Sequence, residues 1–144
     1  MKKFVFRLAA ALKARQTILE AKQAEVLELT GRFDLATQLL QDTEAKLSAH
    51  VQHGPRVGST FDPARELQNQ RHRQQIREEV DRRRELVRQL NEHLEKARDA
   101  LAEAYRDVRA LEVLEERDRA TWALEMKREE QKISDDSTAQ RHGR

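Results

Sequence analysis

The chain of 144 residues has no cysteine, only 2 prolines and 4 glycines, and few aromatic residues, which make up 4% of it. The absence of cysteine excludes disulfides and thiolate chemistry and gives no sign of secretion. The longest apolar run, Leu8 to Leu12, is far shorter than the roughly 20 residues of a membrane-spanning helix. Because Arg7, Lys13 and Arg15 interrupt the N-terminal apolar stretch, it does not match a secretory signal peptide. We therefore expect a cytoplasmic protein.

Charged residues are abundant and make up 38% of the sequence. A composition rich in Ala, Glu, Arg, Leu and Gln, with regular apolar spacing, is typical of long helices rather than of disorder. So polar a chain cannot fill a compact core, but it can fill a narrow seam between two helices. A seam of that kind is weak alone, so the composition also predicts a partner.

The main helix-breaking stretch is residues 53–63. Gly54 followed by Pro55 is a typical helix end, and Asp62 followed by Pro63 suits an N-cap and a first helical position. We predict a single domain, 1–144, made of a first helix over about 3–52, a turn at 53–62, a second helix over about 62–135 and a frayed tail at 136–144.

Apolar residues recur every seven positions along both predicted helices, which indicates a coiled coil. With a short connection, the predicted fold is all-α: a long antiparallel two-helix coiled-coil hairpin with an overhanging C-terminal helix. The expected register opposes residues whose numbers sum to 116, such as Leu19 and Ala97. It leaves residues 116–135 without an intrachain partner. The predicted seam residues are Leu8, Leu12, Leu19, Val26, Leu29, Phe33, Leu40, Ile76, Val80, Val87, Leu90, Leu94, Leu101 and Val108.

No set of nucleophile, base and orienting group occurs in the sequence, and it has no glycine-rich phosphate loop. The spacing of His50 and His53 could chelate a metal, but no third ligand completes a known motif. We therefore expect no catalytic residues, no metal and no cofactor.

Basic residues suggest an alternative function, a helical module that binds nucleic acid or an anionic membrane. Residues 1–19 carry five basic and no acidic residues, and residues 82–84 are all arginine. Glutamates and aspartates interleave with the arginines, however, and no aromatic platform for stacking bases lies among them. The acidic residues favour a charged coiled-coil exterior, so we expect no nucleic acid as a partner.

Both ends of the sequence carry a family resemblance. The opening Lys3-Phe4-Val5-Phe6-Arg7-Leu8 and the ending Trp122-Ala123-Leu124-Glu125-Met126-Lys127-Arg128-Glu129-Glu130-Gln131-Lys132, followed by Asp135-Asp136, resemble the FliJ family of flagellar type III protein-export components. The YscO type of injectisome stalk protein has a similar pattern and is an alternative.

The resemblance implies a non-catalytic component that is similar to the central stalk of rotary ATPases. Such a protein couples the export ATPase, FliI, to the export gate protein, FlhA, and escorts export chaperones. It implies a cytoplasmic location, peripheral at the cytoplasmic face of the inner membrane and dependent on the export apparatus.

Two sets of candidate binding residues follow. The overhang and the basic N-terminus predict an ATPase-binding surface, because an aromatic side chain without intramolecular cover is a typical anchor. Its residues are Phe4, Phe6, Arg7, Trp122, Met126 and Ile133. Family members often carry aromatics on the gate side, in the loop-proximal half of the hairpin. This chain has His72, Arg73 and Arg83 there instead, so the resemblance assigns these three to the gate side.

Overall fold

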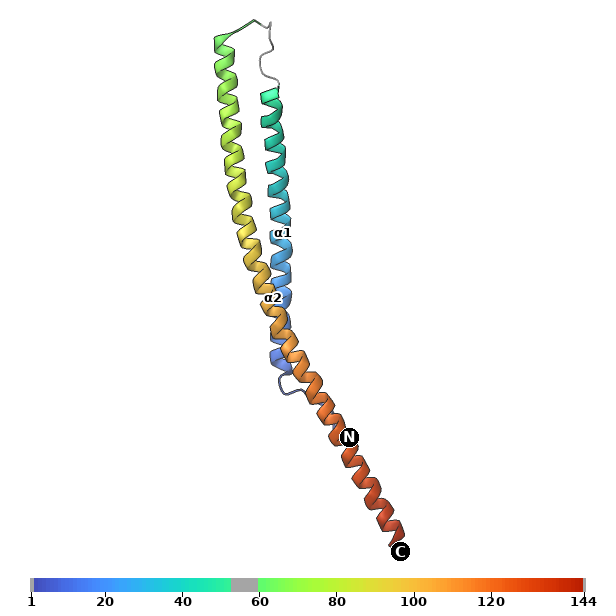
Figure 1. Cartoon of the computed structure of the whole chain (residues 1–144). Coiled ribbons are helices and arrows are strands. Elements are labelled where there is room, and N and C mark those ends of the chain that lie inside the picture. Colours follow the sequence, from blue (N-terminus) through green and yellow to red (C-terminus); the bar gives the residue numbers. More distant parts are fainter. Residues whose placement is uncertain (1, 53–59, 144) are drawn as a thin grey trace. The chain divides into compact units, whose positions relative to one another are not determined.

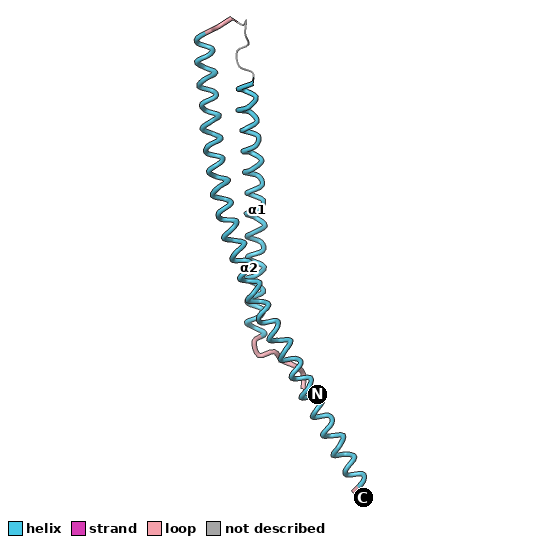
Figure 2. The backbone as a smooth tube through the Cα atoms, viewed as in Figure 1, coloured by secondary structure: helices cyan, strands magenta, loops and turns pink. Residues whose placement is uncertain are grey.

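The computed structural model describes residues 2–52 and 60–143 (Figure 1). These ranges contain two helices, α1 (Ala9–Gln52, 44 residues) and α2 (Pro63–His142, 80 residues), and no strand. The two long helices pack against each other (Figure 2), which confirms the predicted all-α helical hairpin. Most of the predicted turn, residues 53–59, lies outside the described residues. Neither α1 nor α2 has, in its described residues, an apolar stretch that could cross a membrane.

The N-terminus of α2 is capped as the sequence predicts. The backbone N–H of Ala64 donates to Oδ1 of Asp62 at 3.1 Å, and the N–H of Glu66 donates to the Asp62 carbonyl at 3.0 Å. Pro63 occupies the first helical position, where its missing N–H costs no hydrogen bond. At the other end α2 continues to His142 rather than ending near residue 135. No glycine or proline interrupts residues 134–142, so no local signal ends the helix earlier.

The chain forms two compact units. The terminal unit combines Met1–Lys22 with Leu101–Arg144, and the middle unit is Gln23–Ala100. Each unit therefore contains one stretch of α1 and one stretch of α2. The single domain expected from the sequence stays a prediction.

The core of the middle unit is a narrow row of apolar and small side chains between the helices. Leu94 is its most buried residue, with 2% of its surface exposed. The other buried members are Ala36, Thr43, Ile76, Val80 and Ala97. Small residues in this row let the two backbones approach closely. Outside it, the guanidinium of Arg84 bonds the carboxylate of Glu44 at 3.1 Å across the helices, an exposed ion pair that contributes little to stability.

The core of the terminal unit is a cluster of apolar residues. Phe6, Leu12 and Val108 are buried there, and four half-buried residues pack against them: Phe4, Leu8, Leu19 and Leu111. Across both units, each of the fourteen residues predicted for the seam is buried or half-buried. A heptad pattern requires such burial. That the fourteen residues form one continuous seam stays a prediction.

The register between the helices differs from the expected one. In the terminal unit Arg15 pairs with Asp107 at 3.4 Å, and in the middle unit the ring of His50 lies 5.0 Å from that of His72. The residue numbers of both pairs sum to 122, and those of Arg84 and Glu44 in the middle unit sum to 128, so none of the three pairs fits the expected 116. The expected register was wrong by about one heptad, because a seven-residue repeat fits its partner equally well after a slide of seven residues. The same seam residues are used in either register.

Crosslinking distinguishes the two registers. Because the sequence has no native cysteine, only the introduced cysteines can react. We expect the double variant Arg15→Cys with Asp107→Cys to react rapidly with a short bifunctional thiol reagent. The matched pair Arg15→Cys with Leu101→Cys represents the register that sums to 116. Its second cysteine lies about 9 Å nearer the N-terminus of α2 than residue 107 does, so this pair should react slowly. Faster crosslinking of the second pair would show that the observed register is wrong.

Candidate protein-interaction surface

Residues 2–8 form a non-helical segment in front of α1, which we call the strap. Its side chains alternate in burial: Phe4 is half-buried and Phe6 is buried, while Val5 is 81% exposed and Arg7 is exposed. This period of two is that of an extended chain. A turn joins the strap to α1, because the N–H of Ala9 donates to the carbonyl of Phe6 at 3.2 Å.

The prediction of a helix from residue 3 is therefore wrong for the strap, since α1 begins at Ala9. In a helix Phe4 and Phe6 would point about 200° apart, so they could not both contact α2. The extended strap places both aromatic side chains on one side. Aromatic and β-branched residues such as Phe4, Val5 and Phe6 also favour extended backbone.

Phe4 attaches the strap to α2. Its ring centroid lies 5.9 Å from that of Trp122, with the rings tilted by 57°, a favoured geometry for aromatic pairs. The guanidinium of Arg119 lies 4.8 Å from the centre of the same Phe4 ring, within the range of a cation–π interaction. Arg119 is held in turn by Glu115, one helical turn earlier, at 3.2 Å. Phe4 thus contacts both a cation and an indole.

The sequence-based expectation that nothing in the chain covers Trp122 is also wrong. Trp122 is half-buried, and Phe4 of the strap is one of its partners. The physical reason is reach. An extended residue advances the chain by about 3.3 Å, whereas a helical residue advances it by about 1.5 Å, and residues 2–6 are not helical. The strap therefore meets α2 further toward its C-terminus than a helix from residue 3 could.

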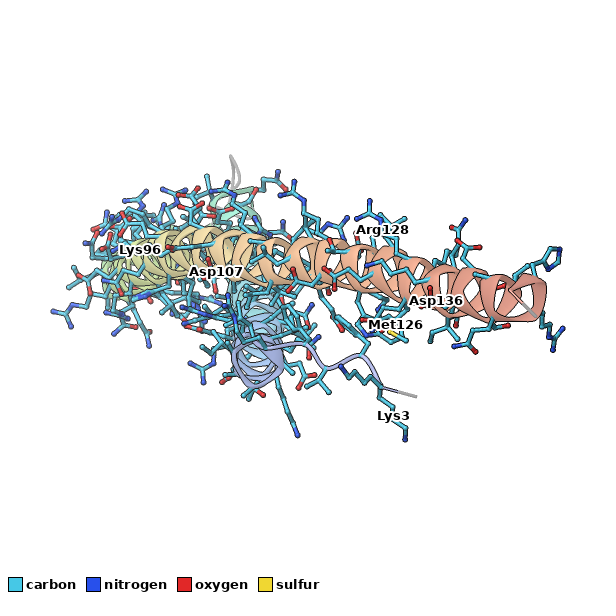
Figure 3. The ribbon with its side chains drawn as sticks, turned by 90° about the horizontal axis from the view of Figure 1, so that it is seen from below. Lys3, Lys96, Asp107, Met126, Arg128 and Asp136 are labelled. Atoms are coloured by element: carbon cyan, nitrogen blue, oxygen red, sulfur yellow. The ribbon has the colours of Figure 1, made fainter. Side chains whose placement is uncertain are left out.

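An open groove of about 320 Å³ lies beside the strap. Trp122, Ala123 and Met126 supply its apolar lining, and Lys2, Lys127 and Glu130 supply charged groups. Figure 3 shows Met126 on the side of α2 that faces the strap, with Arg128 on the opposite side. The strap contributes Lys2 to this groove, and α2 contributes the other lining residues.

After Met126 α2 continues as an exposed helix, whose first turn still lines the groove through Lys127 and Glu130. Every residue from 127 to 143 is exposed, and we call this segment the arm. Ile133, which is 70% exposed, lies on it. Of the six predicted ATPase-side residues, the structure brings Phe4, Trp122 and Met126 together around the strap. Phe6 lies in the terminal core, Arg7 is exposed on the strap, and Ile133 is two helical turns beyond Met126.

The three predicted gate-side residues lie in the middle unit but do not gather at one site. His72 contacts the ring of His50. Arg73 and Arg83 each bond a glutamate of their own helix: Arg73 bonds Glu66 at 2.9 Å and Arg83 bonds Glu79 at 2.8 Å. The hydrogen bond from Arg83 lowers the pKa of Glu79 and so favours its carboxylate form. Arg83 lies about 15 Å along α2 from Arg73.

The sequence profile of the family described as "Flagellar FliJ protein" matches residues 12–144, nearly the whole chain. The chain belongs to the FliJ family. This assignment makes it a flagellar export-related protein and confirms the resemblance inferred from its two ends. No curated protein and no solved structure is similar enough to count as a match.

The FliJ match includes Trp122, Met126, Ile133 and the gate-side residues but starts after the strap. Sequence reasoning missed the strap contact of Arg119 and the pairing of His50 with His72. The strap did have a signal, the run Phe4-Val5-Phe6, whose aromatic and β-branched residues favour extended backbone. The contacts of Arg119 and of His50 had no such sequence signal, because they depend on which residues of separate segments face each other.

The single tryptophan reports directly on strap attachment. We expect Phe4→Ala to shift the fluorescence emission of Trp122 to longer wavelength, because the indole loses its aromatic cover to water. The lost aromatic contact should cost about 1 kcal/mol of strap attachment, while far-UV circular dichroism stays strongly helical. Val5→Ala is the matched control, since Val5 is exposed on the same strap. Equal emission spectra for the two variants would show that Phe4 does not cover Trp122.

Proposed function

We propose that this FliJ-family chain is a non-catalytic stalk that couples the export ATPase, FliI, to the export gate protein, FlhA, with its terminal unit on the ATPase side. The main support is the arm, a helical segment whose every described residue, 127–143, is exposed. A helix without packing on an apolar face is marginal in water, because most helical stability in proteins comes from such packing. A partner that covers the arm would supply the packing that stabilises this part of the helix.

The apolar residues near the arm have the spacing of a helix that docks into a groove. Trp122, Met126 and Ile133 are separated by four and seven residues, so they share one face within about 40°. Binding through such anchors is the usual mode for amphipathic helices. Ile133 offers the largest exposed apolar surface of the three, and Met126 lines the groove beside the strap.

Charge supports the same end of the molecule. Lys2, Lys3 and Arg7 give the strap three positive charges, whereas the arm carries four basic and four acidic residues. A positively charged strap beside a neutral helix favours a partner surface with acidic residues next to an apolar groove. Such complementarity raises the association rate and its sensitivity to salt more than it raises affinity.

The gate side of the proposal assigns the middle unit to FlhA, through His72, Arg73 and Arg83. Arg73 and Arg83 are each held by a glutamate, so their guanidinium groups are already oriented. Export chaperones are the third proposed class of partner. A stalk between these partners works at the cytoplasmic face of the inner membrane, where it is attached only through the export apparatus.

The arrangement of the arginines does not favour a nucleic-acid module. Arg73, Arg83, Arg84 and Arg88 each bond at least one glutamate of the same chain. Phosphate groups would have to compete with these carboxylates for each guanidinium. We therefore keep the stalk as the single proposed function.

Truncation after Met126 removes the arm and leaves the strap and its groove partners Trp122 and Met126 in place. We expect the truncated protein to remain helical by circular dichroism and to keep its Trp122 emission, but to lose binding to FliI in a pull-down and to abolish swimming. The point variant Ile133→Ala should weaken FliI binding by about tenfold, as loss of an interface anchor commonly does.

Leu27→Ala is the matched control for the point variant. Leu27 is 75% exposed and lies in the middle unit, so its truncation removes a similar apolar surface away from the arm. It should bind FliI as the unaltered protein does. If the truncated chain bound FliI normally and supported swimming, the arm would not be the ATPase-binding element.

A further inference from the structure

Two histidines from different helices meet in the middle unit. His50 lies in the last turn of α1 and His72 lies near the start of α2, and their ring centroids are 5.0 Å apart with the rings tilted by 52°. His50 is half-buried, whereas His72 is exposed. The pair therefore has one side within the protein and one side open to solvent.

The buried side of this pair holds an unsatisfied nitrogen. Nδ1 of His50 is shielded from solvent and has no hydrogen-bond partner among the described residues. Most buried polar atoms in proteins are paired, and an unpaired one is unfavourable. A ligand that accepts a lone pair from an imidazole nitrogen would remove this deficit.

We propose that His50 and His72 form a metal site that bridges the two helices and takes a divalent first-row transition metal such as Zn²⁺ or Ni²⁺. Neutral imidazole is a preferred ligand of these ions and is available near neutral pH. Two nitrogens on one tetrahedral ion lie about 3.4 Å apart at the usual bond lengths. Rings with centroids 5.0 Å apart reach that separation by rotating about their side-chain torsions.

The site has two protein ligands. No group of three His, Asp or Glu side chains that could hold a metal occurs in the described part of the chain, so water fills the remaining positions. A bound ion joins the last turn of α1 to α2. Because the two ligands face each other only in the folded hairpin, binding stabilises the folded state by mass action. This inference is independent of the proposed stalk function.

The test uses the full-length protein with ZnCl₂ and, separately, NiCl₂. Equilibrium dialysis should find one ion per chain, and the midpoint of thermal unfolding should rise with metal concentration and fall back when EDTA is added. His50→Gln and His72→Gln should each weaken binding tenfold or more and remove the rise. Glutamine is similar in size and polar, so both variants should keep the unaltered helical spectrum. His142→Gln, at the exposed end of α2, is the control and should bind as the unaltered protein does.

Two results would overturn the assignment. The first is normal metal binding by His72→Gln, which would place the ion on His50 with His53, a residue outside those described. The second is metal-dependent dimerisation in analytical ultracentrifugation, which would mean that the ion bridges two chains rather than two helices of one chain. Absence of any bound metal in the unaltered protein would equally refute the site.

Discussion

The apolar seam between α1 and α2 is the constraint on which the rest of this structure depends. Few residues are available to fill it, and in the middle unit several of its most buried members are as small as Ala36, Thr43 and Ala97. The ion pairs around it are largely exposed and add little stability each. The chain can therefore stabilise two helices only where each covers the other, and any stretch of either helix without cover depends on something else.

In the terminal unit the strap supplies additional apolar cover for α2. Phe6 contributes to the terminal core with Leu12 and Val108, and Phe4 reaches as far as Trp122. An extended segment covers more length of α2 per residue than a helix does, so a few aromatic residues extend the covered part of α2. Past Met126 every described residue of α2 is exposed. The exposed arm is the direct consequence, and it is why a partner is expected at this end.

The sequence predicted those features that depend on local pattern. The fourteen apolar residues predicted from the heptads are each buried or half-buried, and Asp62 with Pro63 marked the start of α2. The register could not be predicted in the same way, because a seven-residue repeat is unchanged by a slide of seven. Contacts that depend on the register, such as that of His50 with His72, could therefore not be predicted from the sequence.

The strap shows a different limit. Phe4, Val5 and Phe6 adjoin a strong helical pattern, and extending that pattern back to residue 3 overlooked their preference for extended backbone. The residues predicted for the ATPase side stay a prediction, and the contact between Phe4 and Trp122 was not expected. Trp122 and Met126 are where the ATPase-side surface was expected, yet the strap covers part of Trp122. The fully exposed element is the arm, which lies further along α2.

The central claim is that the arm is uncovered in the free protein and is bound by the export ATPase. Hydrogen exchange measured by mass spectrometry, with and without this ATPase, tests it most directly. In the free protein the amides of residues 127–143 should exchange rapidly, because a helix that buries no apolar surface opens easily. Adding FliI should slow exchange across the arm and leave residues 23–52 and 60–100 unchanged. Slow exchange of the arm in the free protein, or protection by FliI confined to the middle unit, would contradict the account.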